Sequence, residues 1–122
     1  MKLLQTEIHE IESAAELEKI INENDNVMVC CGRMGPMCLP VYDVMESLER
    51  KYDHVAFRDM NFDGPAAHNI KSLPQVRHFT GLPFVVYFKN GKVVHAFSSV
   101  QTKAQVKAVL DEHFSAPLAK AS

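Results

Sequence analysis

Three cysteines, Cys30, Cys31 and Cys38, lie within nine residues, after an apolar stretch and before a helical pattern, and the chain has no other cysteine. A thiol at the start of a helix is favoured in its thiolate form by the free N–H groups and the partial positive charge there. A cysteine can attack a disulfide, ligate a metal, or pack as a small apolar side chain. Thiol–disulfide exchange is therefore the leading chemistry, with a metal site and a purely structural role as alternatives.

Cys31 and Cys38 are the candidate pair for a reversible disulfide. A disulfide needs Cα atoms about 4.4–6.8 Å apart. The six residues between the two cysteines include two glycines and a proline, so this segment can fold back to that distance at a small entropic cost. If the preceding strand persists, Cys30 points to the opposite face from Cys31, and we expect this third thiol in the core.

A metal site has less support from the residue types. Three thiols and one imidazole could hold zinc in a tetrahedral site, but the six histidines are scattered and none has ligand spacing to the cysteines. An iron–sulfur cluster normally takes four cysteines, which this chain lacks. We therefore expect no metal at the cysteine cluster.

The composition is that of an ordinary globular chain. Its 122 residues are 47% apolar and 23% charged, which is enough for one domain with a hydrophobic core. A net charge of −2 gives no reason to expect nucleic acid or an acidic membrane as a partner, and no apolar run could span a bilayer. The first residues lack the apolar part of a secretory signal. We therefore expect a cytoplasmic protein, in which disulfides are transient or catalytic.

Strands and helices alternate around the cysteines. The continuous apolar run over residues 27–31 predicts a central strand buried on both faces. Apolar residues at i, i+3, i+4 and i+7, starting from Val41, predict an amphipathic helix over about residues 37–52. Residues 84–88 and 93–97 flank an Asn-Gly pair, which is the preferred sequence for a two-residue type I′ hairpin turn.

The other predicted elements complete an α/β order. They are a short edge strand over residues 5–11, a helix opened by the capping box at Ser13, a strand over 55–60, a short helix over 66–71, and a last helix opened by a capping box at Thr102. The order β-α-β-α-β-α-β-β-α predicts a mixed central sheet of four to five strands with helices on both faces. Residues 1–114 form one predicted domain, and residues 115–122 a disordered tail.

This order, with a cysteine loop opening the second helix, resembles the thioredoxin fold. Further similarity lies in the stretch Thr80-Gly81-Leu82-Pro83-Phe84, in the following Phe88-Lys89-Asn90-Gly91-Lys92, and in Asn61-Phe62-Asp63. In thioredoxins the corresponding proline is cis, precedes the hairpin and faces the active-site loop. The resemblance implies that the backbone of a protein substrate pairs beside Leu82 and Pro83, with Gly35 and Pro36 across the docking site.

The loop departs from the family's Trp-Cys-Gly-Pro-Cys motif. Aligned without gaps from the second helix, Cys38 takes the resolving position, Gly35 the position of the nucleophile and Met34 that of the tryptophan. Val29 falls where the family carries a buried acid. Asp59 falls where the family often has a lysine that assists proton transfer. It could act as an acid/base for a thiol, and the alternative is an exposed acid at a strand end.

The resemblance therefore implies an atypical thioredoxin-like thiol–disulfide oxidoreductase with Cys-x6-Cys in place of Cys-x-x-Cys. Cys31 would be the exposed attacker of a partner protein's disulfide and Cys38 the resolving thiol, in cell redox homeostasis and electron transport. Electrons would come from a thioredoxin-reductase-type donor or a small thiol, without an organic cofactor. The alternative is a redox-inactive binding module that docks peptides beside Pro83. Gly35 and Val29 favour this alternative.

Overall fold

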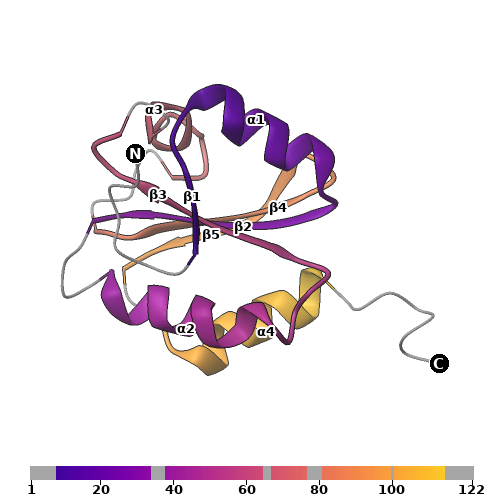
Figure 1. The fold of residues 1–122 in the computed structure, drawn as a ribbon. Helices are drawn as coiled ribbons and strands as arrows, with labels where there is room; N and C mark the ends of the chain where they lie inside the picture. Colours follow the sequence, from indigo (N-terminus) through magenta and orange to yellow (C-terminus); the bar gives the residue numbers. More distant parts are fainter. Residues whose placement is uncertain (1–7, 34–37, 65–66, 77–80, 100, 115–122) are drawn as a thin grey trace.

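A five-stranded sheet lies between two layers of helices (Figure 1). The computed structural model describes residues 8–33, 38–64, 67–76, 81–99 and 101–114. The strands are β1 (His9–Ile11), β2 (Asn26–Gly32), β3 (Ala56–Asn61), β4 (Phe84–Lys89) and β5 (Lys92–Ser98). The helices are α1 (Ala14–Glu23), α2 (Leu39–Glu49), α3 (Ala67–Lys71) and α4 (Lys103–His113). The predicted order of elements is confirmed, and the predicted tail lies outside the described residues.

The sheet is mixed, in the spatial order β1-β3-β2-β4-β5. β1, β3 and β2 are parallel neighbours, while β4 runs antiparallel to β2 and to β5. The hairpin between β4 and β5 turns at Asn90 and Gly91, which have φ of 53° and 82°, as the predicted type I′ turn requires. β2 therefore lies in the middle of the sheet, and both of its faces are covered.

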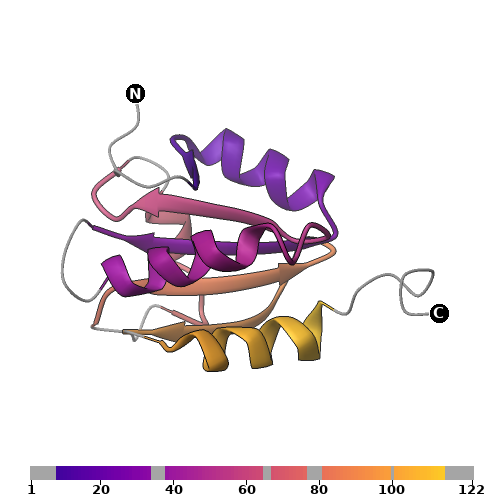
Figure 2. The same ribbon diagram turned by 60° about the horizontal axis from the view of Figure 1, so that its bottom comes forward.

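The two faces of β2 carry different side chains into two separate cores. Val27, Val29 and Cys31 belong to the cluster that includes side chains of α1 and α3. Met28 and Cys30 belong to the cluster with α2 and α4. Figure 1 shows α1 and α3 above the sheet and α2 and α4 below it, and Figure 2 shows α2 and α4 side by side on one face. Strand alternation thus separates neighbouring residues by the full thickness of the sheet.

Two predicted boundaries differ from the observed ones. α2 begins at Leu39, with Cys38 as its N-cap residue and a proline in its first turn, and it ends at Glu49 rather than near residue 52. β1 is limited to His9–Ile11, whereas residues 5–7 of the predicted strand lie outside the described part. Among the described residues, no helix is long and apolar enough to cross a membrane.

Candidate functional site

Three side chains converge on Gly32, the last residue of β2. A Cβ atom at Gly32 would lie 2.7 Å from Sγ of Cys38, 2.9 Å from the hydroxyl oxygen of Tyr42 and 3.1 Å from Cβ of Pro83. Atoms are rarely found so close to a real Cβ, so only glycine permits this approach. The Leu82–Pro83 peptide bond is cis. The end of β2, the start of α2 and the start of β4 thus form one small site.

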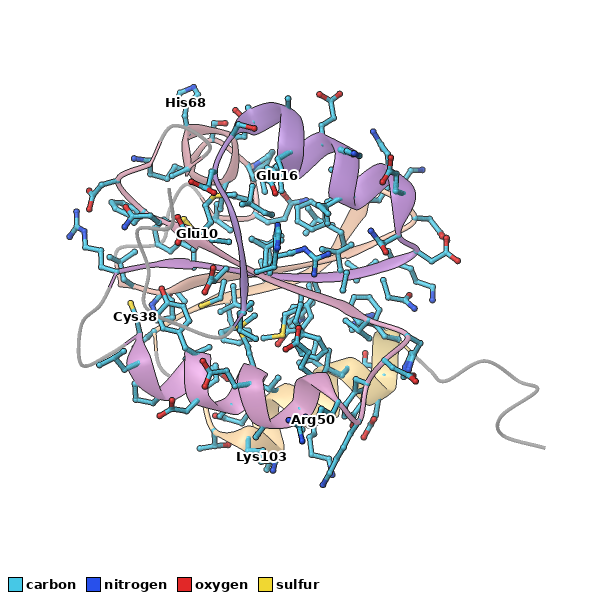
Figure 3. The ribbon with its side chains drawn as sticks, viewed as in Figure 1. Glu10, Glu16, Cys38, Arg50, His68 and Lys103 are labelled. Atoms are coloured by element: carbon cyan, nitrogen blue, oxygen red, sulfur yellow. The ribbon has the colours of Figure 1, made fainter. Side chains whose placement is uncertain are left out.

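Cys38 lies at the start of α2, at one edge of the molecule (Figure 3). Its Sγ accepts a hydrogen bond from the backbone N–H of Arg33 at 3.3 Å. The Arg33 guanidinium binds both carboxylate oxygens of Asp63, each at 2.8 Å, and so ties the segment after β2 to the segment after β3. Burial raises the pKa of the Cys38 thiol, while the N–H and the positive charge of Arg33 oppose that rise.

Cys31 lies on the other side of the sheet, and its expected exposure is wrong. The side chain is 0% exposed and lies between Met60 of β3 and Phe84 of β4, its register partners. β2 continues through Cys31 to Gly32, so strand alternation directs this thiol into the core beneath α1 and α3. Burial raises the pKa of Cys31 to about 12, although the charge of Lys71 opposes the shift.

Cys30 shares its core with Cys38. The residue is fully buried, as expected for the third thiol, and belongs to the cluster that contains Cys38. Its register partners are Asp59 on β3 and Val85 on β4. Burial, followed by the neighbouring Cys38, raises the pKa of Cys30 well above its usual value. All three cysteines are free thiols in this structure.

Asp59 is buried rather than exposed. Its side chain is 0% exposed, because β3 is an interior strand between β1 and β2. The alternative of an exposed strand-end acid is therefore wrong. Asp59 is in register with Glu10 of β1, which is also buried (Figure 3). Sequence reasoning missed Glu10, although Glu10 follows the apolar Ile8 by two residues and therefore points to the same face of the strand.

Tyr42 is a site residue that sequence reasoning missed. The side chain is 1% exposed, and within the described part of the chain its hydroxyl has no hydrogen-bond partner. Tyr42 follows Cys38 by four residues, which places both on one side of α2. That spacing was the available signal.

The expected docking residues lie next to this site where the structure describes them. Pro83 is buried and its carbonyl accepts a hydrogen bond from the Ser99 N–H at 3.0 Å. Leu82 is half-buried and packs against both cores. Gly35 and Pro36 lie outside the described residues. Among the described residues, no three His, Cys, Asp or Glu side chains are grouped to hold a metal ion.

Comparison with known proteins gives likeness in structure only. No family model matches the sequence, and no curated protein matches it. Thioredoxin from Fasciola hepatica is 25% identical with a TM-score of 0.73, over 87% of this chain and 99% of that one. A single-residue mutant of thioredoxin from Halobacterium salinarum is 19% identical with a TM-score of 0.75, over 91% of this chain and 94% of that one.

A third solved structure is similar to this chain to the same degree. Mitochondrial thioredoxin 3 from Saccharomyces cerevisiae is 21% identical with a TM-score of 0.69, over 85% of this chain and 94% of that one. The strand order, the two helical layers and these likenesses define an α/β protein with the thioredoxin fold. The chain therefore has the fold of the thioredoxins.

Proposed function

We propose that this protein docks an extended peptide of a protein partner beside Pro83 and does not cycle a Cys31–Cys38 disulfide. The observation that carries the proposal is the position of the two thiols in separate cores on opposite faces of the sheet. Joining them would require the end of β2 to give up its pairing with both β3 and β4. A disulfide needs its Cβ atoms to face each other within about 4.5 Å.

The surroundings of Pro83 support the docking part of the proposal. The backbone of Leu82 makes no hydrogen bond to another described residue, so within that part of the chain nothing competes with an added strand for its N–H and C=O. Leu39 follows Cys38 and is 40% exposed, the one large apolar side chain that is exposed among the described residues. An extended peptide with apolar side chains would use both the backbone pairing and the apolar contact.

A dithiol oxidoreductase is the second candidate, and one observation favours it. Cys31 and Cys38 lie on either side of the segment that joins β2 to α2, and both are free thiols in this structure. In that mechanism the Cys31 thiolate attacks a partner's disulfide, and Cys38 then attacks the resulting mixed disulfide and releases the reduced partner. A reductase-type donor or a small thiol would return the electrons. Asp59 would serve as the acid/base.

The first test counts thiols after treating the folded protein with diamide. We expect no Cys31–Cys38 disulfide, because these two thiols lie on opposite faces of the sheet. Mass spectrometry after alkylation measures this, and insulin reduction should be no faster than with the Cys31→Ala variant. An oxidised species lighter by two hydrogens, present in the wild type and lost in Cys31→Ala, would establish the dithiol candidate instead.

The second test uses a peptide selected from a displayed random library on the wild-type protein. We expect the bound peptide to slow hydrogen exchange of the Leu82 amide, measured by NMR, because that N–H pairs with the peptide. Leu39→Asp should weaken binding about tenfold or more, as for loss of an interface anchor. Ser47→Asp, also exposed on α2, is the matched control. Equal binding to both variants, with Leu82 unprotected, would rule out docking at this site.

A further inference from the structure

The Tyr42 hydroxyl and the Cys38 thiol form a pair that the docking function does not use. Both atoms lie within 2.9 Å of one point, the Cβ position of Gly32, although the hydroxyl makes no hydrogen bond with any described residue in this structure. A buried hydroxyl without a partner loses the hydrogen bonds that it made in water. The position of this hydroxyl is explained if one state of the nearby sulfur, the thiolate, accepts its hydrogen bond.

We propose that Cys38 is a single reactive thiol and that the Tyr42 hydroxyl donates a hydrogen bond to its thiolate. Cys38 already receives the Arg33 N–H at 3.3 Å and lies at the positive end of the 11-residue helix α2. A thiolate accepts more than one hydrogen bond, and the Tyr42 hydroxyl, which borders the same Gly32 Cβ position as the sulfur, is the second donor. Together these groups oppose the rise in pKa that burial imposes on a nearly buried sulfur.

Tyr42 can act only as a donor in this pair. Burial, with the nearby Cys30, Cys38 and Asp59, raises the pKa of Tyr42 far above the neutral range. The hydroxyl therefore keeps its proton whenever Cys38 ionises. It stabilises the thiolate without removing the proton, which leaves to solvent.

The reaction is an exchange of one disulfide for another. The Cys38 thiolate attacks one sulfur of a small-thiol disulfide, a Cys38–sulfur bond forms, and the original S–S bond breaks. The displaced thiolate leaves and takes up a proton from water. The number of disulfides is unchanged, so no further oxidant is needed, and a second small thiol reverses the step. This chemistry goes beyond peptide docking, because it requires neither a peptide nor Cys31.

The test isolates Cys38 in a Cys30→Ala, Cys31→Ala background. Glutathione disulfide is expected to give a mixed disulfide on Cys38, detected by mass spectrometry, and the rate of iodoacetamide alkylation against pH gives the thiol pKa. Tyr42→Phe should raise that pKa by about one unit, because it removes one hydrogen bond to a charged group, and so slow alkylation near neutral pH about tenfold.

Tyr87→Phe is the matched control. Tyr87 is also buried, lies in the same core and has a hydroxyl without a partner among the described residues, but its burial-raised pKa responds to Cys30 and not to Cys38. We expect Tyr87→Phe to leave the Cys38 pH profile unchanged. Superimposable profiles for Tyr42→Phe and Tyr87→Phe, or no mixed disulfide with glutathione in the background protein, would overturn the proposal.

A second variant keeps the test valid if Tyr42→Phe does not fold. Incorporating 3-fluorotyrosine at position 42 leaves the hydroxyl in place and makes it a stronger donor. The pKa of Cys38 should then fall below that of the background protein, whereas a pKa that stays the same or rises would contradict the assignment. Since no peptide is present in any of these measurements, their outcome is independent of the docking test.

Discussion

Gly32→Ala is expected to lower the free energy of unfolding by about 1–3 kcal/mol, the usual effect of overpacking a tight site. The added methyl group would meet Sγ of Cys38 at 2.7 Å, the Tyr42 hydroxyl at 2.9 Å and Pro83 at 3.1 Å. The sulfur and the proline belong to elements fixed by the sheet and by α2, so the methyl group cannot be accommodated by one flexible side chain. Urea denaturation followed by circular dichroism measures the change.

Two further variants decide whether this close approach is the cause. Gly81→Ala is the control, because a Cβ there meets only Cβ of Ser99 at 3.7 Å, and we expect a change within about 0.5 kcal/mol. Adding Cys38→Ala to Gly32→Ala should recover part of the loss, because it removes the nearest atom. Strictly additive effects of Gly32→Ala and Cys38→Ala would show that the two residues do not touch.

Val29→Asp should have the larger effect, a loss of about 3 kcal/mol or more in the free energy of unfolding at neutral pH. Val29 is fully buried in the core beneath α1 and α3, on the face of β2 away from Cys38. A carboxylate there would be desolvated at the centre of an apolar cluster. Urea titrations at several pH values measure the loss.

The pH dependence gives this prediction its sign. Burial raises the pKa of a carboxyl group, so the folded state binds the proton more tightly than the unfolded state does. The stability gap between Val29→Asp and the nearly isosteric Val29→Asn should therefore narrow as the pH falls towards 4. A Val29→Asp protein that is as stable as Val29→Asn at neutral pH, with an altered Cys38 pKa, would place residue 29 on the other face.

The sequence predicted the elements well because each had a local signal. The capping box at Thr102 is formed in both directions, by the Thr102 hydroxyl and by the Gln105 side chain, and the Asn-Gly pair lies at the hairpin turn. These signals depend on a few neighbouring residues, so they need no knowledge of packing. The order of the elements then restricts the topology to a small set.

The side of the sheet on which each thiol lies could not be predicted in the same way. A strand buried on both faces is apolar at every position, so its pattern carries no alternation to mark the two sides. The apolar run predicted a strand as far as Cys31, but nothing local showed that β2 continues to Gly32. A shift of one residue in the pairing register of such a strand would exchange the faces on which Cys30 and Cys31 lie.

Asp59 and Tyr42 were misjudged for a related reason. A charged residue at a strand end is usually solvated, and the burial of Asp59 depends on β1 adding to the sheet beyond β3. The sequence pattern does not distinguish Tyr42 from the apolar residues of α2. Its proposed role rests on Gly32, where the absence of a side chain lets the hydroxyl and the Cys38 sulfur approach one point. The four-residue spacing indicates only that Tyr42 and Cys38 share one side of α2, whereas the burial of Asp59 and the approach of Tyr42 to Gly32 depend on tertiary packing.

The buried tyrosines also provide the protein with an optical reporter. The chain has no tryptophan and three tyrosines, so its intrinsic near-ultraviolet signal comes from Tyr42, Tyr52 and Tyr87. Tyr42 and Tyr87 lie in the core that contains Cys30 and Cys38, whereas Tyr52 is only partly buried against that core and donates a hydrogen bond to Asp111 at 2.7 Å. Ionisation or covalent capture of Cys38 can therefore be followed in unlabelled protein by tyrosine fluorescence, with Tyr52→Phe removing the background emission.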